Sequence, residues 1–178
     1  NDPAKDVTGK WVLTTPKTAE LYSAVAYFFA RQLRKDLGVP VGMINSSVGG
    51  TPVEAWTSLD TLNKQFPEIL AILQERAKAA DPEQVQKRYE ASLKMYEKKL
   101  KLAKDETARA AIVKPRKSSD TKPEFRRPYW LYNGMIAPLI PLTFRGVIWF
   151  QGCANVSRWQ TYHKQFPALI ADWRAGWK

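Results

Sequence analysis

The sequence predicts an α/β fold, in which buried parallel strands alternate with amphipathic helices. Two short apolar runs, 39–44 and 147–150, are bounded by glycine, proline or polar residues, as buried strands are. Apolar residues recur at spacings of three and four over 18–37, before the first run, and over 162–173, after the second. The first of these helices is predicted to end at Gly38 and to pack through one apolar face, which consists of Leu21, Val25, Phe28, Leu33 and Leu37. The order helix, tight turn, strand is typical of α/β units. We therefore expect both runs to be strands of a parallel sheet.

Length and composition favour one globular domain over 1–178. The chain has 178 residues, of which 44% are hydrophobic and 12% aromatic, which is enough for a core. The longest apolar run, 139–150, is interrupted by polar residues and is shorter than the roughly 20 residues of a membrane-spanning helix. A single cysteine, Cys153, excludes an internal disulfide and a cysteine-based zinc cluster.

The net charge of +11 is concentrated in one segment, 74–127, which holds 16 Lys and Arg against 9 Asp and Glu. Asp81 and Pro82 predict the start of a long helix there, with apolar residues on one face and charges of both signs on the other. A mixed face of this kind is typical of a helix exposed to solvent. A basic interaction module remains an alternative, but no nucleic-acid-binding motif accompanies the charge, and we expect no nucleic-acid partner.

A second helix is predicted just before this one, because Phe66 and Pro67 precede a run with helical periodicity. Together the two helices predict a helical hairpin inserted into the core fold. The stretch 114–128 is rich in Lys, Ser, Asp and Pro, and we interpret it as an exposed connection back to the core. The whole insertion is expected over 62–128.

The first polar loop, which begins at Asn45 and includes the glycine pair, follows the first predicted strand. Gly49 and Gly50 lie there, and Thr51 with Glu54 three residues later predicts a capping box at the start of a helix. Backbone N–H groups at such a corner are unsatisfied and can bind an anion or the oxyanion of an acyl-transfer intermediate. An ordinary strand-to-helix turn explains the pattern equally well.

The second polar loop, 151–155, follows the second predicted strand. Asn155 is a candidate oxyanion donor through its side-chain amide, although a turn role explains an asparagine there too. Ser46 and Ser47 in the first loop are interpreted as turn residues, because no G-x-S-x-G motif surrounds them. The single histidine, His163, is expected to be exposed.

Three motifs, in order, resemble the sialate O-acetylesterase branch of the SGNH hydrolases. They are Asn45-Ser-Ser-Val-Gly-Gly-Thr-Pro-Val-Glu-Ala-Trp56, Leu131-Tyr-Asn-Gly-Met-Ile-Ala-Pro-Leu139 and Val147-Ile-Trp-Phe-Gln-Gly152. The resemblance implies a flavodoxin-like, three-layer parallel sheet, of which this chain would hold a part. It also implies that Gly49 or Gly50 and Asn155 donate to an oxyanion hole, and that Trp56, Gln151 and Cys153 contact the substrate.

The activity implied by the resemblance is release of acetate from a sugar hydroxyl, with a serine nucleophile, a histidine base and no cofactor or metal. The implied partner is an acetylated carbohydrate, and the implied location is the periplasm or the exterior of the cell. The family pattern Glu-Ser-Asn is replaced here by Cys153-Ala154-Asn155.

The family's Gly-Gln-Ser-Asn-like nucleophile motif and its late Asp-x-x-His motif do not occur in this sequence. We therefore expect an internal portion that is inactive alone, with a second chain or further segments completing the sheet. The alternative is a catalytically silent sugar-binding or regulatory module that uses Trp56, Trp149 and Phe150.

Overall fold

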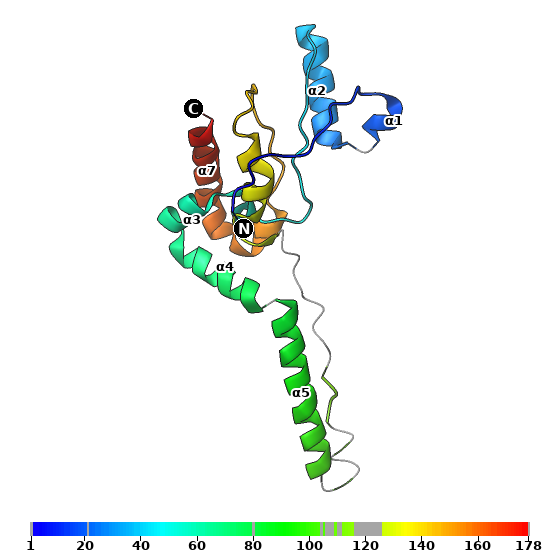
Figure 1. Ribbon diagram of the computed structural model, residues 1–178, viewed down its shortest axis with the longest axis vertical. Coiled ribbons are helices and arrows are strands. Elements are labelled where there is room, and N and C mark those ends of the chain that lie inside the picture. The colour runs from blue at the N-terminus through cyan, green and yellow to red at the C-terminus, as the bar shows by residue number, and fades with distance from the viewer. Residues whose placement is uncertain are drawn as a thin grey trace.

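The computed structural model in Figure 1 describes residues 2–20, 22–79, 81–103, 105, 109, 112–115 and 126–177. Every regular element in these ranges is a helix. The α-helices are α1 (Pro16–Ala19), α2 (Ala24–Leu37), α3 (Leu59–Gln65), α4 (Pro67–Ala79), α5 (Pro82–Leu102) and α7 (Trp159–Gly176). Four shorter helices have 3-10 or π geometry: η1 (Val53–Trp56), η3 (Tyr132–Ile136), η4 (Ala137–Leu139) and η5 (Cys153–Arg158).

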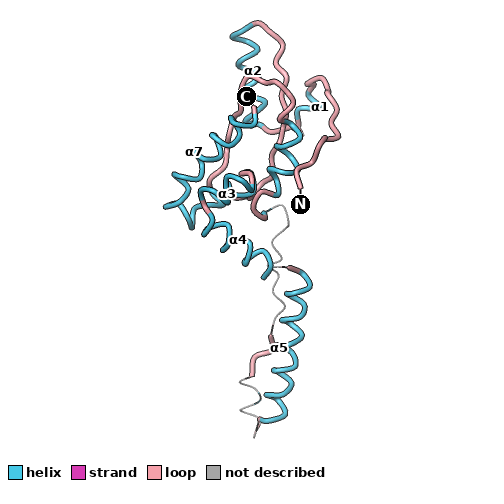
Figure 2. Tube along the Cα trace, turned by 60° about the vertical axis from the view of Figure 1, so that its left-hand side comes forward, coloured by secondary structure: helices cyan, strands magenta, loops and turns pink. Residues whose placement is uncertain are grey.

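The predicted three-layer parallel sheet is wrong, because the described residues contain no strand (Figure 2). No backbone hydrogen bond of the described residues joins either 39–44 or 147–150 to a neighbouring segment. Several apolar side chains of both runs are exposed, up to 89% for Phe150. An apolar run has the side chains that a buried strand needs, but only a neighbouring strand can satisfy its backbone N–H and C=O groups. Neither run has such a neighbour in the part of the chain that is described.

The helix expected over 18–37 is split in two, because Ser23 caps a new start and its side chain accepts from the Ala26 N–H. Its predicted stop is confirmed. Gly38 adopts a left-handed φ of 66°, and its N–H donates to the carbonyl oxygen of Arg34. Of the side chains that the periodicity placed on the packing face of α2, Val25, Phe28 and Leu37 are exposed, and Leu33 is partly buried.

The core lies where η1, η3 and α7 meet. Its buried apolar residues are Val53, Ala55, Trp56, Leu131, Ile136, Leu169 and Trp173. The Trp173 indole donates to the carbonyl oxygen of Trp56 at 2.9 Å, and its ring meets that of Trp149 edge to face at 5.6 Å. This contact fixes the short helix η1 against the long helix α7, so the first polar loop has a rigid support.

Asp172 on α7 joins that helix to the start of α3. Its carboxylate accepts from the Ser58 N–H at 2.8 Å, from the Ser58 hydroxyl at 2.7 Å and from the Thr61 hydroxyl at 2.7 Å. Ser58 is the N-cap of α3, and its hydroxyl also accepts from the Thr61 N–H. Burial, and then the negative charge of Asp172, raise the pKa of nearby Tyr132. The region after η1 is therefore held to α7 by polar as well as apolar contacts.

The predicted helical hairpin is also wrong in its geometry. Both helices exist, and Asp81 caps α5 as expected, since its carboxylate accepts from the N–H groups of Glu83 and Gln84. However, α5 leads away from α4 and from the core instead of folding back along α4 (Figures 1 and 2). Salt bridges on exposed surface, such as Lys87 to Glu83, agree with a solvent-facing helix. Most of the predicted connection 114–128 lies outside the described residues.

Among the described residues, none of the helices combines the length and the apolar character that crossing a membrane requires.

Candidate functional site

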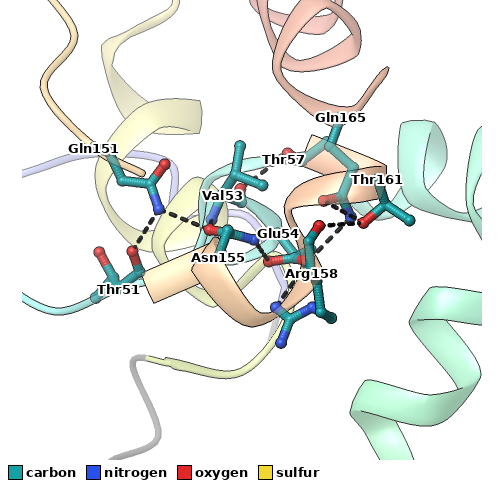
Figure 3. Close-up of polar contacts among 9 residues, drawn as sticks. All are labelled: Thr51, Val53, Glu54, Thr57, Gln151, Asn155, Arg158, Thr161 and Gln165. Atoms are coloured by element: carbon teal, nitrogen blue, oxygen red, sulfur yellow. Dashed lines mark hydrogen bonds and ion pairs between the residues drawn. The ribbon is translucent and has the colours of Figure 1, made fainter. Parts of the chain in front are cut away.

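The two polar loops singled out in the sequence lie side by side, joined by hydrogen bonds between residues about 100 positions apart (Figure 3). The side-chain amide of Gln151 donates to the carbonyl oxygen of Thr51 at 2.9 Å. The N–H of Val53 donates to the side-chain oxygen of Asn155 at 2.9 Å. Each bond joins a residue of the second loop to one just after the glycine pair of the first. The structure therefore brings the two loops to one place without a sheet.

The glycine pair forms an exposed turn. Gly50 has a φ of 70°, a left-handed conformation that favours glycine. The Arg126 Nε donates to the Gly50 carbonyl oxygen at 2.7 Å. A Cβ built on Gly50 would lie 2.9 Å from an Arg126 guanidinium nitrogen, whereas a Cβ on Gly49 would meet nothing within 4 Å. Of the two glycines, only Gly50 therefore has a backbone conformation and surroundings that disfavour any other residue.

This difference gives a testable prediction. Gly50→Ala is expected to lower the free energy of unfolding by about 1–2 kcal/mol, because alanine is strained at positive φ. Gly49→Ala, in the same turn, is expected to change it by no more than about 0.5 kcal/mol. Urea unfolding of both variants measures the two values. Equal losses in the two variants would contradict a specific requirement at Gly50.

The predicted capping box of Thr51 and Glu54 does not form. The first turn of η1 has Pro52 as its N-cap and no side-chain cap hydrogen bond. Thr51 instead donates to the Val48 carbonyl oxygen at 2.7 Å and accepts from the Trp56 indole at 2.9 Å. Glu54 is free to turn inward, and it is fully buried.

Asn155 is buried, with 1% of its surface exposed, and its carboxamide is held at both ends. Its oxygen accepts from the Val53 N–H and from the Gln151 side-chain amide at 2.8 Å, and its nitrogen donates to Glu54 Oε2 at 3.0 Å. An amide nitrogen carries two hydrogens, so one remains after the bond to Glu54. In this conformation the residue connects the two loops.

Glu54 is the centre of this network and was missed as a site residue in the sequence. Besides Asn155, its carboxylate accepts from Arg158 and from Gln165, each at 3.0 Å to Oε1 (Figure 3). The capping-box pattern gave Glu54 a local role at the start of a helix. The signal that could have corrected this is its position between Val53, Ala55 and Trp56, all of which are apolar.

The three positions expected to contact substrate differ in accessibility. Trp56 belongs to the core, with 3% of its surface exposed. Gln151 is partly buried, and the Tyr162 hydroxyl lies 2.9 Å from its carbonyl oxygen and 3.1 Å from its side-chain oxygen. Cys153 is exposed. Of the three, Gln151 is the one that contacts both polar loops.

The serines of the first loop take part in local contacts. The Ser46 hydroxyl donates to the Met135 carbonyl oxygen at 3.1 Å, and the Ser47 hydroxyl to the Asn45 side chain at 2.7 Å. His163 is exposed on α7, as expected. Among the described residues, no hydrogen bond joins either serine to this histidine, so neither forms the serine–histidine pair that an acyl-transfer mechanism needs.

Known proteins resemble this chain over most of its length. The sialate O-acetylesterases of Homo sapiens and Pongo abelii are each 32% identical to it over 153 residues, which cover 85% of this chain and 21% of the relative. The enzyme of that name from Rattus norvegicus is 32% identical over 170 residues, covering 85% and 25%. No protein-family model matches.

A solved structure agrees with these relatives. The crystal structure of a carbohydrate acetylesterase from Xanthomonas citri matches 99% of this chain with a TM-score of 0.63 and 28% sequence identity. The chain belongs to the sialate O-acetylesterase family. It represents a part of that family's sequence, since it spans about a fifth to a quarter of the length of the relatives it matches. The resemblance read from the three sequence motifs is thereby confirmed.

Proposed function

We propose that this member of the sialate O-acetylesterase family provides the oxyanion-stabilising part of an enzyme that hydrolyses O-acetyl esters of sialic acids or related sugars. The names of its relatives and of its structural neighbour support this reaction class. The observation that supports the proposal is the bond from the Val53 N–H to Asn155, because it joins the carboxamide to the segment that follows Gly49 and Gly50 in the chain.

In the proposed mechanism a serine hydroxyl attacks the acetyl carbonyl carbon and a histidine takes its proton, so that negative charge collects on the carbonyl oxygen. The second N–H of Asn155 and a backbone N–H of Gly49 or Gly50 would donate to that oxygen. Removing one such donor costs about 3 kcal/mol of transition-state stabilisation in known cases. The tetrahedral intermediate then collapses to an acetyl-serine ester as the histidine returns the proton to the departing sugar oxygen. Water hydrolyses this ester, which frees acetate and restores the serine hydroxyl.

Acetate binding tests the donor role without requiring the nucleophile. The purified chain is expected to bind acetate, and Asn155→Ala is expected to weaken that binding about tenfold or more, because a hydrogen bond to a charged group is lost. Asn45→Ala, the same change at an exposed asparagine of the first loop, is the matched control. Calorimetry measures both. Absence of binding, or equal binding by all three proteins, would contradict the proposal.

Ester hydrolysis gives a separate prediction. The chain alone is expected to hydrolyse an aryl acetate no faster than the buffer does, because no serine in the described residues is hydrogen-bonded to His163, the one histidine of the sequence. Release of the aryl alcohol is followed by absorbance. Turnover that disappears in Asn155→Ala would overturn the expectation that the chain is inactive alone.

A sugar-binding module without catalysis is less well supported. It was expected to use Trp56, Trp149 and Phe150, but Trp56 and Trp149 pack on each other, edge to face, at 6.1 Å within the core. Phe150 alone of the three is largely exposed. Calorimetry with an acetylated sialoside distinguishes the two functions, since a binding module would show affinity that Asn155→Ala leaves unchanged.

We further propose that 62–128 is an insertion into the esterase domain, which is supported by the way α5 leads away from the core (Figure 1). An acetylated carbohydrate is the partner that the proposed chemistry requires. A periplasmic or secreted location is proposed from the family alone.

A further inference from the structure

We propose that Glu54 is a positioning residue, which fixes the orientation of the Asn155 carboxamide, and that Arg158 neutralises the charge that this arrangement buries. This inference rests on the proposed function and adds residues that the three sequence motifs did not assign to the site. Its structural basis is the set of contacts drawn in Figure 3.

The first step is the orientation of the amide. Two donors, the Val53 N–H and the Gln151 side chain, point at one end of the Asn155 carboxamide, so that end must be the oxygen. The other end faces Glu54 Oε2 at 3.0 Å, which is an acceptor and requires a nitrogen. Turning the amide by 180° would set donors against donors on one side and acceptor against acceptor on the other. Glu54 thus decides, together with the two donors, where the remaining N–H of Asn155 lies.

The second step is the rigidity of Glu54 itself. Its backbone carbonyl accepts from the Tyr129 N–H at 2.8 Å, and its fully buried side chain receives three hydrogen bonds. Two of the three donors, Arg158 and Gln165, come from the segment that follows Asn155, one at the end of η5 and one on α7. The carboxylate therefore holds η1, η5 and α7 in one arrangement around Asn155.

The third step concerns charge. A lone buried carboxylate next to an oxyanion donor would oppose the negative charge that the donor has to stabilise. The Arg158 guanidinium lies 3.0 Å from Glu54 Oε1, and its side chain is one-quarter exposed, so it cancels the buried charge while remaining partly solvated. The pair allows a carboxylate to orient Asn155 without making the site repel an anion.

Proton exchange from the Asn155 side chain tests the inference. In the chain labelled with 15N-asparagine, the Asn155 amide protons are expected to exchange with solvent about 10- to 100-fold more slowly than those of exposed Asn45, because one is bonded to a charged group. In Glu54→Gln the new side chain keeps its oxygen toward Arg158 and Gln165 and sets its NH2 against Asn155. Protection at Asn155 is then expected to fall by about the same factor.

The matched control is Arg158→Met, which removes the cationic partner of Glu54 but leaves the hydrogen bond between Glu54 and Asn155 in place. It is expected to leave Asn155 protected while weakening the binding of acetate. Unprotected Asn155 protons in the unmodified chain would overturn the inference even if Glu54→Gln does not fold. Equal protection in the unmodified chain and in a folded Glu54→Gln would overturn it as well.

The two proposals can fail separately. If Asn155 is protected in a Glu54-dependent way but acetate does not shift its amide resonances, the positioning inference stands and the oxyanion function fails. If acetate shifts the Asn155 resonances equally in the unmodified chain and in Glu54→Gln, the oxyanion function stands and the positioning inference fails.

Discussion

Glu54→Gln is expected to lower the free energy of unfolding by about 3 kcal/mol, a large effect for a change that leaves the side chain's shape intact. Glu54 accepts three hydrogen bonds inside the protein, and glutamine can accept on only one of its two terminal atoms. At least one buried donor loses its acceptor, and Arg158 loses its counter-charge. Leaving buried polar groups unpaired costs more than an average hydrogen bond contributes.

Glu75→Gln is the matched control for this prediction. Glu75 makes a 2.8 Å salt bridge to Lys78 on α4, and both side chains are more than 70% exposed. Because solvent screens exposed pairs, the same change of carboxylate to amide is expected to cost at most about 0.5–1 kcal/mol there. Urea unfolding followed by circular dichroism compares the two variants. Similar losses would show that Glu54 is not the centre of a buried network.

The helices could be predicted from the sequence wherever a local signal fixes their ends. Asp81 with Pro82 predicted the start of α5, and Gly38 predicted the end of α2. Both signals act through hydrogen bonds to residues within one helical turn, so the sequence nearby contains all the information needed. The break before Ser23 was missed because the apolar periodicity continues across it.

The two strands could not be predicted in the same way. The runs 39–44 and 147–150 have the composition of strands, but a strand depends on backbone partners that lie elsewhere in the chain or outside it. Local patterns contain no information about whether those partners are present. The prediction failed because no such partner is present among the described residues, and several of the apolar side chains that a sheet would have covered are exposed.

The candidate site was predicted in part. The polar loops that contain Gly50 and Asn155 were identified, and the structure places them side by side, although by a different route from the expected sheet. The role of Glu54 was assigned incorrectly because a threonine followed three residues later by a glutamate fits a capping box. Only the long-range contacts with Arg158 and Gln165 distinguish a buried acceptor from a cap.

Trp173→Ala is expected to have the largest effect on stability, lowering the free energy of unfolding by about 4 kcal/mol. Trp173 belongs to the buried core, with 8% of its surface exposed, and its ring lies against that of Trp149. Alanine would leave a cavity there. It would also remove the donor from the Trp56 carbonyl oxygen, which is buried. Thermal and urea unfolding measure the loss.

Trp177→Ala, one helical turn later on the same chain segment, is the control. Trp177 is only partly buried, and its indole donates to the Leu142 carbonyl oxygen in an exposed contact. Its removal is expected to cost about 1–2 kcal/mol, because less apolar surface is lost and water can replace the donor. Equal losses at Trp173 and Trp177 would contradict the view that the contact between η1 and α7 dominates the stability of this core.

The same pair of variants links stability to the proposed site. Trp173 fixes the backbone of η1 through Trp56, and η1 begins with the Val53 N–H that holds Asn155. At a temperature where both variants remain folded, Trp173→Ala is therefore expected to weaken acetate binding, whereas Trp177→Ala is expected to leave it within about twofold of the unmodified chain. Unchanged acetate binding in folded Trp173→Ala would show that the polar network holds the two loops together without support from the aromatic core.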